Sequence, residues 1–92
     1  MRLDKFLQTS RIVKRRAVAS ELCGRGRVRV NGRPCKAGKE LQVGDALSLQ
    51  FRSGSVFECK ILELPTRGIR KEEAAGLYET VNDTRSDGDR DS

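Results

Sequence analysis

Arginine and lysine side chains gather within the segment SRIVKRRAVASEL, residues 10–22, at Arg11, Lys14, Arg15 and Arg16. Guanidinium and ammonium groups bind phosphate, and one guanidinium can donate two parallel hydrogen bonds to a phosphate group. The apolar spacing that follows predicts a helix, whose first turn would add free N–H groups and a positive dipole end. The segment therefore predicts a phosphate-binding surface. The pattern leaves one alternative open, a solvated basic face without a ligand.

Charge is arranged along the chain rather than spread evenly. The net charge is +6, and residues 1–40 contain 12 lysines and arginines against 3 acidic residues. Residues 41–80 contain 5 against 6, and residues 81–92 contain 2 against 4. A basic front half indicates a polyanionic partner. Aromatic residues make up only 4% of the chain. Proteins that bind single-stranded RNA stack its bases on aromatic side chains, so we predict that the partner is folded RNA.

Other cations could extend this surface. Arg2 and Lys5 lie on a preceding predicted helix, and several arginines follow on a predicted strand, whose alternation prevents all of them from sharing one face. Arg16 has an alternative role, because it could pair with Asp4 across the two helices, and both roles are compatible. The predicted RNA-binding residues are Arg2, Lys5, Arg11, Lys14, Arg15, Arg16, Arg25, Arg27 and Arg33.

The residue types exclude several kinds of site. Histidine is absent, and Cys23, Cys35 and Cys59 are widely spaced, so a zinc site would lack a fourth ligand. No cysteine has a plausible general base, and we expect neither catalysis nor a cofactor. No apolar run approaches the ~20 residues of a membrane span, and the N-terminus lacks the apolar segment of a secretory signal. We therefore expect a cytoplasmic protein.

Two helices are predicted to position the basic segment. Leu3, Phe6 and Leu7 have the spacing of one helix face over residues 2–10, and Ser10 could cap the next helix. That second helix is predicted from about Val13 to Cys23, with glycines after it.

Strands are predicted for most of the remainder. Residues 28–30 alternate before an Asn31-Gly32 turn, and residues 46–63 read as an antiparallel hairpin. A short helix is expected within residues 70–81, docked on the sheet. The segment NDTRSDGDRDS, residues 82–92, has no apolar residue and is predicted to be a disordered acidic tail. The sequence thus predicts one α+β domain over residues 1–81, with two N-terminal helices on a small, mainly antiparallel sheet.

The string KRRAVASELCGRGRVRVNGR resembles the S-four RNA-binding domain family. The resemblance rests on Arg16, Ala19, Leu22, Gly26, Val28, Val30, Asn31 and Gly32, and on the later segment VGDALSL. The segments RLDKFL, KRRAVA and EEAAGLYE are similar to one branch, which includes ribosome quality-control factors of the RqcP type and the heat-shock 15-kilodalton ribosome-associated protein. A short acidic tail in place of a long basic extension favours the RqcP type.

The resemblance implies a fold and a function. It implies a small alpha-L RNA-binding domain that binds stalled large ribosomal subunits, contacting their ribosomal RNA and the peptidyl-tRNA. It also implies a functional partner of the RqcH type, which extends the stalled chain with a template-free alanine tail, and we expect a monomer.

Alternative functions remain open from the sequence. A ribosome-assembly or general ribosomal-RNA chaperone factor would have the same fold. A basic adaptor for an acidic protein surface is compatible with the charge alone, and an enzyme is disfavoured because no residues are left for chemistry.

Overall fold

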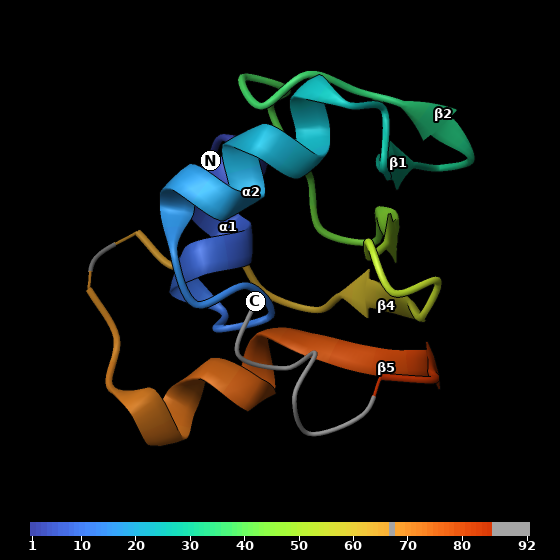
Figure 1. Ribbon diagram of the computed structural model, residues 1–92. Coiled ribbons are helices and arrows are strands. Elements are labelled where there is room, and N and C mark those ends of the chain that lie inside the picture. The colour runs from blue at the N-terminus through green and yellow to red at the C-terminus, as the bar shows by residue number, and fades with distance from the viewer. Residues whose placement is uncertain (67, 86–92) are drawn as a thin grey trace.

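The computed structural model describes residues 1–66 and 68–85, which form two helices, a five-stranded antiparallel sheet and a 3₁₀ helix (Figure 1). The helices are α1 (Leu3–Thr9) and α2 (Arg16–Gly24), and the 3₁₀ helix is η1 (Lys71–Leu77). The strands are β1 (Val28–Val30), β2 (Arg33–Pro34), β3 (Ala46–Gln50), β4 (Val56–Ile61) and β5 (Tyr78–Asp83). Their order in the sheet is β2-β1-β3-β4-β5, and the α+β fold class predicted from the sequence is confirmed.

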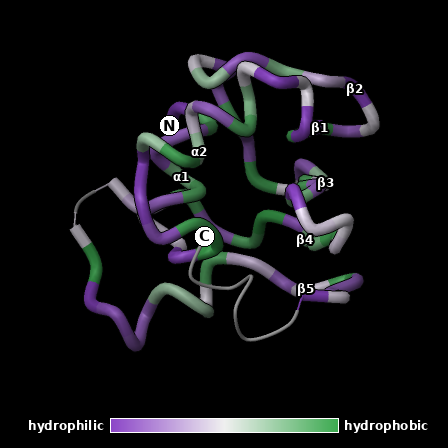
Figure 2. Tube along the Cα trace, viewed as in Figure 1, coloured by the Kyte–Doolittle hydropathy of each residue, from purple (hydrophilic) through white to green (hydrophobic). Residues whose placement is uncertain are grey.

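A single core lies between the two helices and one face of the sheet. Leu3, Phe6 and Leu7 of α1 are fully buried, as their helical spacing predicted. Alternate residues of β3 and β4, among them Leu47, Leu49, Phe57 and Ile61, face the helices and are also buried. Figure 2 shows the contrasting segment, the hydrophilic stretch that leads into α2. The packed core therefore fixes the positions of the two helices that carry the predicted cations.

The predicted tight turn after β1 is confirmed. Asn31 and Gly32 have φ angles of 52° and 82°, the left-handed pair that a two-residue antiparallel hairpin requires. The Asn31 amide nitrogen donates to Asp45 Oδ1 at 3.1 Å, and Asn31 Oδ1 accepts from Ala46 N at 3.0 Å. The predicted hairpin over residues 46–63 is also present, as β3 and β4.

The second helix begins later than predicted. It starts at Arg16 instead of Val13, because Ile12 and Val13 are drawn into the core and are almost completely buried. Ser10 does not cap α2, since it is the C-cap of α1 and its hydroxyl donates to the Leu7 carbonyl at 3.3 Å. The connection over residues 10–15 is thus held by tertiary packing.

The C-terminal region contains a strand that the sequence analysis did not predict. The expected helix over residues 70–81 is wrong in its second half, where β5 pairs antiparallel with β4 over Phe57–Ile61. This pairing satisfies the backbone groups along the outer edge of β4. The predicted tail also begins too early, since Asn82 and Asp83 belong to β5 and Thr84 N donates to the Val56 carbonyl. Residues 86–92 of that tail lie outside the described residues.

Candidate nucleic-acid interface

Two guanidinium groups meet at one buried carboxylate. Arg2 Nε donates to Asp4 Oδ1 at 3.3 Å, and Arg16 Nε donates to Asp4 Oδ2 at 3.2 Å. The Asp4 side chain is 6% exposed, whereas those of Arg2 and Arg16 are 53% and 49% exposed. Arg2, Asp4 and Arg16, the Asp4 cluster, thus confirm the predicted Arg16–Asp4 pair. Both arginines stay open to solvent, so the carboxylate holds them in place without burying them.

The ionisation of Asp4 suits this role. Burial raises the pKa of its carboxyl, but the hydrogen bond and charge of Arg16, the Lys5 backbone N–H at 2.8 Å and the charge of Arg2 outweigh burial. The net effect lowers the pKa of Asp4 below its ordinary value. The carboxylate is therefore ionised at neutral pH and can accept hydrogen bonds from both guanidinium groups.

The loop before β3 fixes the N-terminus of α1. The backbone N–H groups of Leu3 and Asp4 donate to the carbonyls of Lys39 and Ala37, at 2.8 and 3.1 Å. Leu41 N donates in turn to the Met1 carbonyl at 3.0 Å. The start of α1 is therefore already satisfied by protein, and its role is to carry Arg2 and Asp4.

The N-terminus of α2 is different. Arg15 is its N-cap residue and makes no side-chain capping bond with any part of the chain that the structure describes. Arg16 is the first helical residue, and Lys14, Arg15 and Arg16 are exposed together. A nine-residue helix places its positive dipole end beside these three cations. Cationic side chains and free helix N–H donors at one place are the combination that phosphate-binding sites use.

The remaining predicted residues lie elsewhere. Arg25 follows the far end of α2, about 13 Å along the axis from Arg16, and pairs with Glu21 at 3.2 Å. Arg27 is half-buried, Arg33 lies on the edge strand β2, and Arg11 occupies the connection before α2 with a φ of 61°. The structure thus gathers Arg2, Lys14, Arg15 and Arg16 and separates the strand arginines from them.

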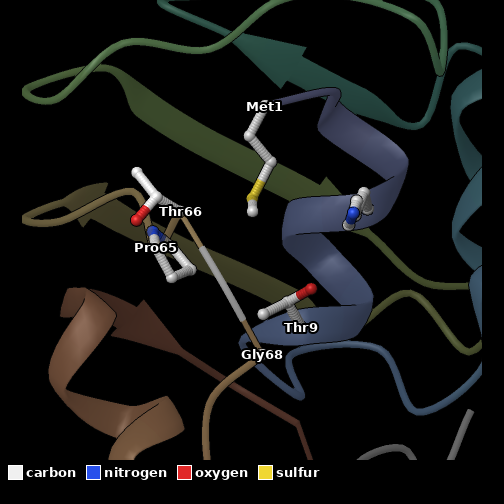
Figure 3. A pocket seen from close by; sticks show the side chains of 6 residues that line it. Met1, Thr9, Pro65, Thr66 and Gly68 are labelled. Atoms are coloured by element: carbon white, nitrogen blue, oxygen red, sulfur yellow. The ribbon is translucent and has the colours of Figure 1, made fainter.

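Lys5 faces a small pocket rather than the Asp4 cluster. This pocket has a volume of about 180 Å³ and lies between α1 and the segment after β4. In Figure 3, Met1 and Thr9 of the N-terminal region stand opposite Pro65, Thr66 and Gly68. The pocket and the Asp4 cluster are therefore separate features.

Two arginines with defined positions were missed from the sequence. Arg52 lines a groove beside α2 together with Arg25. Arg85 is buried although its neighbours in the sequence are polar. No local pattern marks either residue, because each contact is made with a distant element.

The buried cysteines are poor nucleophiles. Burial is the main cause that raises the pKa of Cys23 to about 11 and that of Cys59 to about 12, so both thiols are protonated at neutral pH. No group of three potential metal ligands gathers within residues 1–66 and 68–85. In the same residues, no helix has the length and apolar character needed to cross a membrane.

Comparison with known proteins gives the family. The model of the S4 domain matches residues 1–47. The RQC P-site tRNA stabilizing factor of Streptococcus pneumoniae is 44% identical over 85 residues, covering 92% of this chain and 94% of that protein. The factor of the same name from Halalkalibacterium halodurans is 46% identical and covers 86% and 88%. A trimeric structure of Vibrio cholerae Heat Shock Protein 15 superposes with a TM-score of 0.78 at 27% identity, covering 88% of this chain and 81% of that one. This chain therefore belongs to the S4 domain family, in the branch that contains the RQC P-site tRNA stabilizing factors.

Proposed function

We propose that this protein binds large ribosomal subunits that retain a peptidyl-tRNA and stabilises the tRNA in the P site during ribosome-associated quality control. The observation that carries this proposal is the similarity of nearly the whole chain to factors of that name, at 39–46% identity in several bacteria. The activity proposed is binding, without a chemical step. It takes place in the cytoplasm, and the protein acts as a monomer beside a tailing factor of the RqcH type.

The Asp4 cluster supplies the proposed grip. Each guanidinium contacts Asp4 through Nε, and within the described residues neither guanidinium makes another hydrogen bond or ion pair. The terminal nitrogens can therefore donate to phosphate oxygens. Since Asp4 already restricts both side chains, RNA binding loses less side-chain entropy than it would with free arginines.

Neighbouring charges strengthen this grip. Asp4 neutralises one of the two cluster arginines, and Lys14 and Arg15 add two more positive charges beside the α2 N-terminus. A rigid basic ridge of this kind suits ribosomal RNA and tRNA, whose helices are recognised by shape and by their phosphates. We propose Lys5, Arg11, Arg25, Arg27 and Arg33 as peripheral contacts.

The proposal is tested by measuring which kind of ribosomal particle the protein binds most strongly. Tagged protein is mixed with purified large subunits carrying peptidyl-tRNA, with empty large subunits and with small-subunit precursors, and each mixture is sedimented through sucrose. We expect the strongest cosedimentation with the tRNA-bearing large subunits. Preference for small-subunit precursors would favour the assembly factor. Retention of a protein partner after nuclease digestion would favour the adaptor.

A further inference from the structure

The side chain of Arg85, two residues after β5, is buried, and each of its guanidinium nitrogens donates a hydrogen bond. Its side chain is 7% exposed. Nε and Nη2 donate to the two carboxylate oxygens of Asp83, at 3.0 and 3.2 Å. Its guanidinium carbon lies 4.0 Å from the Phe57 ring centroid and 5.6 Å from that of Phe51. A buried charge is costly unless it is paired and hydrogen-bonded, and here it is both.

The remaining nitrogen reaches across the molecule. Nη1 donates to the Ile12 carbonyl at 3.1 Å, a contact between residues 73 positions apart. Ile12 belongs to the connection between α1 and α2, which leads directly into Lys14, Arg15 and Arg16. Two backbone bonds also hold this connection, from Arg11 N to the Gln8 carbonyl and from Val13 N to the Leu7 carbonyl.

We propose that Arg85 is a positioning residue for RNA binding, a clasp that fixes the α1–α2 connection and thereby the place of the cations at the start of α2. This inference rests on the proposed function. Arg85 itself is too buried to contact a phosphate. It acts through the Ile12 carbonyl, which fixes the backbone two residues before Lys14 and so reduces the entropy that RNA binding must remove. β5 is the strand that carries Asp83 and Arg85 to this point.

The variants are chosen so that the chain still folds. Arg85→Met alone would leave Asp83 without its guanidinium partner, so it is combined with Asp83→Asn. Arg85→Lys is the second variant, since it retains a charge beside Asp83 and Phe57 but not the planar fork that reaches both Asp83 and Ile12. Deletion of residues 86–92 is the control for the exchange experiment, because it removes acidic charge that follows in the sequence and leaves Arg85 in place.

Amide hydrogen exchange shows, in the absence of RNA, how strongly Arg85 stabilises the α1–α2 connection. We expect exchange at Arg11 and Val13 to rise about tenfold or more in both substitution variants, while exchange at Gln50 and Ile61 in the sheet changes much less. Unchanged exchange at Arg11 and Val13 would overturn the clasp, whatever the protein binds.

Binding to tRNA-bearing large subunits, measured well below the melting temperature, tests the positioning role. We expect about tenfold weaker binding in both substitution variants, with an unchanged slope of log K against log salt, since no phosphate contact is lost. A slope reduced by about one would make Arg85 a direct contact and overturn the inference. Equal affinity despite faster exchange would make it purely structural. If the wild-type protein does not bind these subunits, the proposed function fails, and the exchange experiment still decides the clasp.

Discussion

Asp4 controls the geometry of the proposed interface, although its negative charge would repel a phosphate. A carboxylate near a phosphate site normally opposes binding, but this one is almost inaccessible and is covered by two guanidinium groups. Its value lies in orientation, because it holds arginines from two separate segments at fixed places. At the scale of the residue, the interface is therefore an ion-pair network whose outward side is positive.

Replacing Asp4 by asparagine is predicted to lower stability in a pH-dependent way. The folded-state pKa of Asp4 is lowered, so its contribution is present above the unfolded value of 3.8 and is lost as the pH falls through the folded value. We expect Asp4→Asn to cost about 1 kcal/mol at pH 7, a modest figure because both partners are half-exposed. Urea unfolding at pH 7 and pH 2.5 measures this, and a difference between the proteins that is as large at pH 2.5 as at pH 7 would contradict it.

The start of α2 has a cation, and no favoured capping residue, at the N-cap position. Serine, threonine, aspartate and asparagine are the favoured N-cap residues, yet this helix begins with Arg15 at that position. Its φ and ψ of −115° and 132° are those of an ordinary N-cap. At the scale of the element, a cation occupies the place where a capping side chain would stabilise the helix.

Arg15→Ser is therefore predicted to change stability and binding in opposite directions. Serine can cap the helix and stabilise the fold by about 0.5–1 kcal/mol, while the loss of a cation weakens RNA binding. Thermal melts and subunit-binding titrations measure the two effects. Lys60→Ser is the control for charge, since Lys60 lies on β4 opposite Glu79, away from α2. A parallel fall in stability and binding for Arg15→Ser would refute this account of the helix start.

Local patterns predicted the elements that depend on local sequence. Helical spacing in α1 and the Asn31-Gly32 turn were predicted correctly, because neighbouring residues determine them. The start of α2 and the strand β5 were not predicted, since burial of Ile12 and pairing with β4 are tertiary effects. The Arg16–Asp4 pair could be proposed because both residues lie on predicted helices.

The whole molecule presents charge of opposite sign in its two halves. The first 40 residues contain the cations of the interface, whereas residues 86–92 contain three aspartates and one arginine directly after the buried Arg85. Arg85 itself donates to the Ile12 carbonyl, in the connection that precedes α2. We propose that the acidic residues after Arg85 compete with RNA for the basic surface and so restrain non-specific RNA binding.

Deleting residues 86–92 is predicted to tighten binding to RNA of random sequence about two- to threefold at low salt, because a tethered competitor for the basic surface is removed. Deleting residues 84–92, which also removes Arg85, is expected to lose this gain. Filter binding with both truncated proteins measures the effect. Identical random-RNA affinity for the full chain and the 86–92 deletion would reject it.

Salt dependence reports the number of phosphates contacted. The four gathered cations, with one or two peripheral ones, predict a slope of log K against log salt of about −4, since each contact contributes roughly −0.7 to −0.9. Titrations between about 50 and about 300 mM salt, a range on both sides of the physiological ionic strength, give this slope. A slope near −1 would show that the basic surface makes almost no phosphate contacts.

The most direct test concerns Arg16, the residue that links α2 to the Asp4 carboxylate. We predict that Arg16→Gln weakens binding to tRNA-bearing large subunits at least tenfold, about 1.4 kcal/mol, while Lys60→Gln stays within about twofold of wild type. The melting temperature of Arg16→Gln should fall by only a few degrees, because Arg2 still pairs with Asp4. Full affinity in a folded Arg16→Gln protein would contradict the central claim that this cluster grips folded RNA.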